Sequence, residues 1–152
     1  MIEGIFITEL KILLSESGSV MHALRDGDSG YNEFGEIYFS TINKNAIKAW
    51  KLHKKMTLNL VVPIGKVLFC FLDLREDSKT YNNSTKILLS QNPYCRLTVA
   101  PNIWFGFKGI GEGFNLVTNI ADMKHDDNEV LHQDKNKIEI DWDEDNNILN
   151  EF

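Results

Sequence analysis

The sequence predicts an all-β fold, arranged as a sandwich or jelly roll, over one domain of 152 residues. Short runs rich in Val, Leu, Ile and Phe alternate with Gly, Pro, Asn and Ser clusters, which is typical of strands joined by turns. No stretch has the periodicity of a long helix, and no segment repeats. With 43% hydrophobic residues, the chain can form a sizeable core.

The most apolar stretch, Trp50–Glu76, predicts the two central strands. The runs Thr57–Pro63 and Lys66–Leu74 flank Pro63-Ile64-Gly65, and this spacing predicts a hairpin. In the second run, apolar residues occupy both faces of the expected strand. We therefore expect a second sheet or a partner subunit to cover it on both sides.

Weaker versions of the same pattern predict the remaining strands, in chain order. They are Ile5–Leu14, Val20–Leu24, Phe34–Ile42, Ala46–His53, Thr85–Leu89, Tyr94–Val99, Ile103–Phe107 and Phe114–Ile120. The charged stretch after Asp122 includes a predicted short helical turn at Glu129–His132. Ile138–Trp142 is a last extended piece.

Charge and composition exclude several kinds of partner. The net charge of −6 and a pI near 5.2 argue against a nucleic-acid-binding surface, which needs clustered Lys and Arg. The sequence has no apolar run of membrane-spanning length and no signal-peptide pattern, so we expect a cytoplasmic protein without a membrane partner. Cys70 and Cys95 lie in apolar runs and are expected to be buried free thiols.

Two expected strands carry polar side chains at alternate positions. Lys51 and His53 are two residues apart, so a strand puts both on one face. In the strand from Phe34 to Ile42, Glu36 and Tyr38 likewise share a face. These residues are candidates for a polar site beside the most buried strands.

Several short motifs also occur along the chain in an order that is found in a known protein family. They are the Gly18 turn, Phe34–Ser40, Trp50-Lys-Leu-His53, Pro63-Ile-Gly65-Lys-Val, Asp73-Leu-Arg75, Ala100-Pro101 with Gly106-Phe107, and Ile140-Asp-Trp142. Over nearly the whole chain, this series resembles the dTDP-4-dehydrorhamnose 3,5-epimerase family of cupins. The resemblance implies a cupin jelly-roll barrel (a double-stranded β-helix), a homodimer sharing an N-terminal strand, no metal, and a dTDP-linked 4-keto-6-deoxyhexose in the barrel mouth.

Epimerisation beside a ketone needs a base, a stabiliser of the enolate oxygen, and an acid on the opposite face. The resemblance implies that His53 is the base. The family's other functional positions are changed: they fall on Leu58, on Asn115 or Leu116, on Phe105, on Ser17 and near Trp50. The carboxylate that orients the base in the family would fall just past Glu151 and Phe152.

Other side chains can replace some of the missing groups. Lys51 shares a face with His53 and can supply the cation, and Tyr38 is the candidate acid. In the alternative interpretation, neither residue has a functional role: Lys51 only reaches solvent, and Tyr38 is a half-buried strand tyrosine. We expect Tyr38, Lys51, His53, Asn59 and Asn115 around one cavity, with Glu36, Asn59, Trp104 and Asn115 as substrate contacts.

We expect no metal and no other cofactor. Cupin metal sites use His-x-His, a Glu and a later His, and the matching positions are Lys51, His53, Leu58 and a residue near Gly106. The other histidines, at 22, 125 and 132, are expected at the surface. The spacing of Gly109, Gly111 and Gly113 is not that of a dinucleotide-binding loop.

Two functions remain open from the sequence. The first is a metal-independent sugar-nucleotide epimerase or isomerase, as in dTDP-rhamnose and cell-surface polysaccharide biosynthesis, acting beside the ketone of a nucleotide-linked sugar. The second is a non-catalytic cupin that binds a sugar nucleotide or glycan without turning it over. Enolisation distinguishes the two functions, because it exchanges a C–H proton with solvent.

Overall fold

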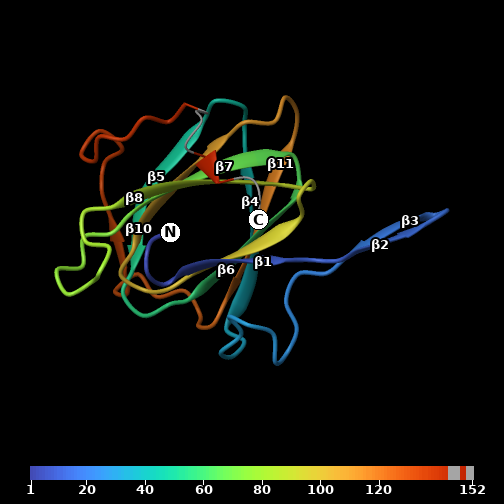
Figure 1. Cartoon of the computed structure of the whole chain (residues 1–152), viewed down its shortest axis with the longest axis horizontal. Coiled ribbons are helices and arrows are strands. Elements are labelled where there is room, and N and C mark those ends of the chain that lie inside the picture. The colour runs from blue at the N-terminus through green and yellow to red at the C-terminus, as the bar shows by residue number, and fades with distance from the viewer. Residues whose placement is uncertain (144–147, 150–152) are drawn as a thin grey trace.

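The structure, a computed structural model, describes residues 1–143 and 148–149 and contains two packed antiparallel sheets (Figure 1). The first sheet has the order β1 (Ile5–Glu9), β9 (Cys95–Val99), β6 (Leu58–Ile64), β11 (Asn115–Ala121), β4 (Glu36–Ile42). The second has the order β12 (Val130–His132), β5 (Ile47–His53), β10 (Trp104–Gly109), β7 (Lys66–Leu72), β8 (Ser84–Ser90), β13 (Ile148–Leu149), of which β13 alone pairs in parallel. This arrangement confirms the predicted all-β cupin jelly roll. The described part of the chain has no helix that is long and apolar enough to cross a membrane.

The core fills the space between the two sheets. Alternate residues of β6 and β7, among them Leu58, Leu60, Phe69 and Phe71, point into it and are almost fully buried. Burial of each such side chain stabilises the fold by about 1.5–3 kcal/mol relative to exposure. Cys70 and Cys95 are buried free thiols, as the sequence predicts.

β6 and β7 do not form the hairpin that the sequence predicts. β6 pairs with β9 and β11 in the first sheet, whereas β7 pairs with β10 and β8 in the second. Gly65, with φ +86°, makes the corner between the sheets, where the Lys66 N–H donates to Asn115 Oδ1 at 2.9 Å. The turn residues signalled a change of direction correctly, but they do not determine whether the next strand stays in the same sheet.

The outer face of β7 is covered by the chain itself. Leu68 and Cys70 pack in a second apolar cluster with Trp50, and the segment 138–142 closes this cluster from outside. Trp142 lies 5.1 Å from Trp50 between ring centroids. Both faces of β7 are therefore buried, as expected. The sequence did not show what covers the outer face, and in the structure segment 138–142 covers it.

The predicted helical turn at Glu129–His132 is wrong. Val130–His132 form β12, which pairs with the edge of β5 so that Val130 lies opposite His53 and His132 opposite Lys51. The physical reason is tertiary: β5 offers unpaired backbone groups at this edge, and pairing buries Val130. The local charge pattern carries no sign of this long-range partner.

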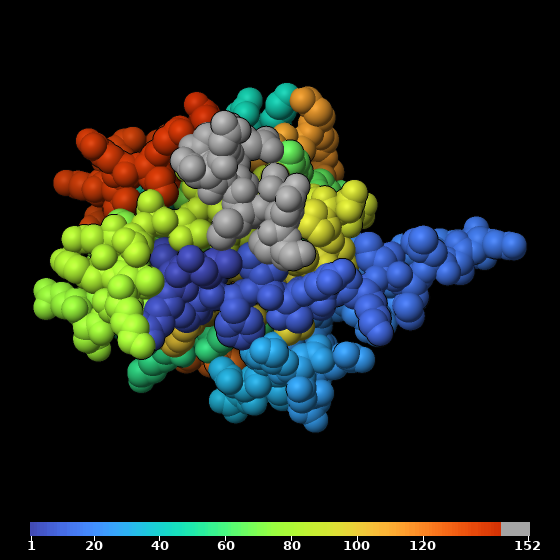
Figure 2. Space-filling model, in the orientation of Figure 1, coloured from blue at the N-terminus to red at the C-terminus, as the bar shows by residue number. Residues whose placement is uncertain are grey.

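The predicted strand Ile5–Leu14 is divided between the barrel and a projecting arm. β1 pairs with β9, while β2 (Ile12–Ser15) and β3 (Gly18–Met21) form a separate hairpin that extends away from the barrel (Figures 1 and 2). On this arm Leu13, Leu14 and Val20 are 52%, 83% and 61% exposed. Neighbouring exposed apolar side chains of this kind are typical of an interaction surface.

Asp73 is expected to be a main stabiliser of the loop after β7. Its fully buried carboxylate accepts hydrogen bonds from Arg75 Nε (2.8 Å), Ser78 Oγ (2.6 Å) and Thr80 Oγ1 (2.7 Å), and these hold its pKa far below the usual value. Asp73→Ala should lower the free energy of unfolding by about 3 kcal/mol at pH 7, because it leaves buried donors and a cation unpaired. Urea denaturation checks this, with the exposed Asp127→Ala as control; a loss below about 0.5 kcal/mol would contradict it.

Candidate active site

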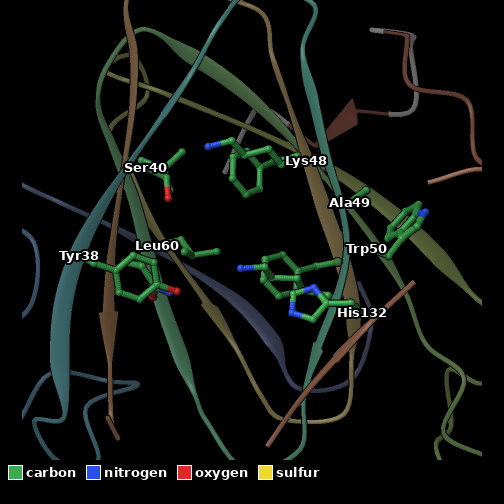
Figure 3. Close-up of a pocket in the computed structure, with 12 residues that line it drawn as sticks. Tyr38, Ser40, Lys48, Ala49, Trp50, Leu60 and His132 are labelled. Atoms are coloured by element: carbon green, nitrogen blue, oxygen red, sulfur yellow. The ribbon is translucent and has the colours of Figure 1, made fainter. Parts of the chain in front are cut away.

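A cavity of about 290 Å³ lies between the sheets on the side where β4 and β5 are edge or near-edge strands (Figure 3). Strands β4, β6 and β11 form one wall, and β5, β10 and β12 form the other. The lining residues are Tyr38, Ser40, Lys48, Ala49, Trp50, Lys51, Leu60, Phe105, Phe107, Val117, Asn119 and His132.

Strand register brings three side chains together on the first wall. Tyr38 pairs with Asn119 across β4 and β11, and Asn119 pairs with Leu60 across β11 and β6. The Asn119 Nδ2 donates to the Tyr38 hydroxyl, which points into the cavity (Figure 3). Burial raises the pKa of Tyr38, so the phenol keeps its proton at neutral pH and is able to donate it.

The opposite wall is cationic. It carries Lys48, Lys51 and His132, although the chain as a whole has a net charge of −6. Burial, with a contribution from the neighbouring Lys48, lowers the pKa of Lys51, although its side chain remains exposed to solvent. The Lys48 Nζ donates to the Thr41 carbonyl at 2.8 Å and lies 6.0 Å from the Phe107 ring centroid. An anionic ligand is favoured beside this wall.

His53 is held by a buried carboxylate beside the same wall. Its Nδ1 is hydrogen-bonded to Glu129 Oε1, and the other carboxylate oxygen accepts the backbone N–H groups of Lys55 (3.2 Å) and Met56 (3.4 Å). Burial raises the pKa of Glu129, but the hydrogen bonds from His53 and these backbone groups outweigh it and lower the pKa overall. An ionised Glu129 accepts the Nδ1 proton, which leaves Nε2 as the proton acceptor of a neutral imidazole.

Nε2 of His53 is buried and has no hydrogen-bond partner in the described part of the chain. The imidazole is stacked on Phe105 with 6.1 Å between ring centroids, and Phe105 lines the cavity. His53 is itself buried beside the cavity and is not one of its lining residues. Burial is the main cause of the raised pKa of Tyr38, and the charges of Glu36 and Glu129 add to it.

The structure does not bring Asn59 or Asn115 to this cavity. Asn59 is next to the inward-facing Leu60 in β6, so it faces the other way, where its Nδ2 donates to the Gly30 carbonyl at 3.0 Å. Asn115 holds the corner at Gly65 by donating to the Ile42 carbonyl and accepting from Lys66. Both amides donate to backbone carbonyls, and Asn59 Oδ1 also accepts from Thr98 Oγ1 at 2.7 Å, so neither amide is free to face the cavity.

Trp104 and Glu36 also differ from the expectation. Trp104 packs against the outer cluster of the second sheet, together with Trp50, and not in the cavity. Glu36 shares the inner side of β4 with Tyr38, and its charge helps raise the Tyr38 pKa, but it does not line the cavity. The predicted Tyr38 and Lys51 do line it, on opposite walls.

Sequence reasoning missed four residues at this site: Lys48, Asn119, Glu129 and His132. Glu129 and His132 were expected in a helical turn, because their partner β5 lies far away in the sequence. His132 is exposed, as expected of a surface histidine, but it also lines the cavity. Asn119 could have been found, since period-two alternation from Val117 puts it on the inner face. The family's carboxylate, expected past Glu151 and Phe152, falls outside the described residues, and Glu129 contacts His53 instead.

No metal centre is evident in residues 1–143 and 148–149. They contain no cluster of three or more His, Cys, Asp or Glu side chains able to hold an ion. His53 and Glu129 contact each other, and two converging side chains are fewer than a transition metal requires.

Sequence comparison gives two curated relatives. A curated protein of Haloferax volcanii, named a probable low-salt glycan biosynthesis epimerase, is 24% identical over 147 residues, covering 93% of this chain and 94% of the relative. The Bacillus subtilis spore coat polysaccharide biosynthesis protein SpsL is 26% identical over 112 residues, 74% of each chain.

Comparison with solved structures finds proteins of the same kind as these relatives. A dTDP sugar isomerase from Desulfovibrio desulfuricans superposes with a TM-score of 0.88 at 35% identity, covering 93% of this chain and 92% of the other. A 3,4-ketoisomerase from Thermoanaerobacterium thermosaccharolyticum has a TM-score of 0.71 at 19% identity, with 88% and 90% coverage, and shares the fold. A sequence profile described as dTDP-4-dehydrorhamnose 3,5-epimerase matches residues 1–151, so this chain belongs to that family of sugar-nucleotide epimerases and isomerases.

Proposed function

We propose that the protein is an epimerase or isomerase of a nucleotide-linked 4-keto-6-deoxyhexose, acting at a carbon beside the ketone with His53 as the base. The observation that carries the proposal is the His53–Glu129 pair. It leaves a buried Nε2, without a partner among the described residues, next to a cavity whose far wall presents the Tyr38 hydroxyl. Two proton-transfer groups on two walls are what inversion at a carbon requires.

In this reaction His53 Nε2 takes the proton from the carbon next to the ketone. The C–H electron pair forms the C=C bond of an enolate, and the former carbonyl oxygen takes the negative charge. The Lys51 ammonium, which lines the cavity two residues before His53, stabilises that oxygen. Tyr38 then donates its proton to the opposite face of the same carbon, the ketone re-forms, and solvent restores both side chains.

The substrate class follows from the charge of the cavity and from the relatives. Lys48 and Lys51 favour an anionic group, which a nucleotide diphosphate supplies. The family profile and the 35% identical dTDP sugar isomerase support the same class. Because the curated relatives are named for glycan and spore coat polysaccharide biosynthesis, we place the activity in the supply of sugars for a surface polysaccharide.

The test is incorporation of solvent deuterium into nucleotide-linked 4-keto-6-deoxyhexoses, followed by NMR and mass spectrometry. We expect exchange at a carbon beside the ketone, with the epimer or isomer as product. Failure to exchange any such substrate, with binding detected by calorimetry, would overturn the enzyme proposal in favour of the non-catalytic binding cupin.

We also propose a homodimer held by the projecting arm, because its exposed leucines need cover. The double variant Leu13→Asp, Leu14→Asp should be monomeric at micromolar concentration by light scattering. Loss of buried apolar surface at a symmetric interface should weaken the dimer by about 100-fold or more. Leu74→Asp, in a loop of the barrel, is the control. A wild-type protein that is monomeric at that concentration would refute the homodimer.

A further inference from the structure

Asn119 is a buried amide at the centre of the first cavity wall. It is 4% exposed, and the register of β11 places it between Tyr38 on β4 and Leu60 on β6. Its neighbours in the strand, Val117 and Ala121, are part of the apolar core. A polar side chain in this row is costly unless both ends of its amide are paired.

Among the described residues, one end of the Asn119 amide is paired and the other is not. Nδ2 donates to the Tyr38 hydroxyl oxygen, whereas Oδ1 is buried and has no hydrogen-bond partner among the described residues. A phenol has one proton to give, and it does not give it to a group that is already donating to it. The Tyr38 O–H is therefore directed away from Asn119, and Oδ1 lacks a donor among the described residues although the Asn119 side chain lines the cavity.

We propose that Asn119 is a positioning residue: its Nδ2 fixes the Tyr38 hydroxyl as a proton donor towards the substrate, and its Oδ1 accepts a hydroxyl of the bound sugar. The inference rests on the proposed function, because it assigns a role within that proton transfer. When Tyr38 gives its proton to the enolate carbon, the phenolate that forms keeps the hydrogen bond from Nδ2. Asn119 thereby stabilises the donor after transfer without exchanging a proton itself.

Two substitutions separate the roles of the two amide atoms. Asn119→Asp retains acceptor oxygens and loses the donor to Tyr38, and its carboxylate competes for the Tyr38 proton. Asn119→Ala loses both. Thr118→Val, on the same strand but on the opposite face, controls for disturbance of β11.

The kinetic test compares inverted product with deuterium exchanged into recovered substrate. Exchange needs only His53, whereas inversion also needs Tyr38. Asn119→Asp should lower the ratio of inversion to exchange by about 10²-fold, within the range for loss of a general acid, and leave KM within about threefold. Asn119→Ala should lower the ratio and also raise KM by about tenfold, because the hydroxyl contact is lost. An unchanged ratio in both variants would overturn the proposal.

A second readout needs no substrate. Ultraviolet titration of each protein against its Tyr38→Phe counterpart gives the pKa of Tyr38, over the pH range in which circular dichroism stays constant. Loss of the donor should raise this pKa by about one pH unit in Asn119→Ala and at least as much in Asn119→Asp. If wild type exchanges no keto sugar, the proposed function fails, but a raised pKa still supports the Asn119–Tyr38 link; an unchanged pKa refutes that link whatever the activity.

Discussion

Replacing His53 with alanine should lower the rate of solvent-deuterium exchange into a 4-keto sugar nucleotide by about 10²–10⁴-fold, as expected for loss of a general base. His53 supplies the one imidazole that is buried beside the cavity and held by a carboxylate. The fold should persist, because the ring contributes one stacking contact with Phe105 and one hydrogen bond with Glu129. Exchange is measured by NMR in D₂O, with folding followed by circular dichroism.

His125→Ala is the matched control. His125 is exposed, and its Nε2 contacts Asp127 at 2.8 Å in the surface loop that precedes Glu129. Its replacement should leave the exchange rate within about twofold, as is usual for surface changes. Equal exchange rates in wild type and His53→Ala would show that the base is elsewhere.

Glu129→Gln should produce the second large effect, a loss of about 10–10²-fold in exchange rate, because the charge that stabilises the imidazolium disappears. The amide of glutamine must also face the N–H groups of Lys55 and Met56, which the carboxylate now accepts. Glu112→Gln, an exposed carboxylate paired with Lys44, is the control. A variant that exchanges as fast as wild type would remove Glu129 from the mechanism.

The same variant has an expected pH signature in stability. The pKa of Glu129 is lowered in the folded protein, so its ionisation stabilises the fold above its unfolded pKa, and this contribution is lost as pH falls through the folded pKa. The difference in unfolding free energy between wild type and Glu129→Gln should therefore be largest near pH 7 and shrink below about pH 4. Urea denaturation at both pH values measures it, and a pH-independent difference would contradict the assignment.

The sequence predicts individual strands well and their partners poorly. Period-two alternation located β4 and β5 to within two residues and put Tyr38 and Lys51 on inward faces. It could not tell that β6 and β7 belong to different sheets, because pairing depends on long-range register and not on local propensity. The error at Glu129–His132 has the same cause, since β12 exists only through its contact with β5.

The same limit explains what was missed at the candidate site. His53 could be chosen from its strand and from the family resemblance, but its carboxylate comes from a residue 76 positions later. Asn59 was expected at the cavity, but the parity of β6 turns it away from the cavity to the Gly30 carbonyl. A polar residue in an apolar strand thus either lines a site or anchors a loop. Which of the two it does depends on whether its side chain points into the space between the sheets or away from it.

The positions of the site residues along the sequence have a consequence for the synthesis of the protein. His53, Tyr38 and Asn119 belong to strands that emerge from the ribosome before residue 122, whereas Glu129, His132 and Trp142 all come from the stretch that follows. A nascent chain that ends at residue 121 has every strand of the first sheet but leaves His53 without its carboxylate and the outer side of β7 uncovered. A product that terminates at residue 121 would therefore lack both the carboxylate that contacts His53 and the segment that covers β7.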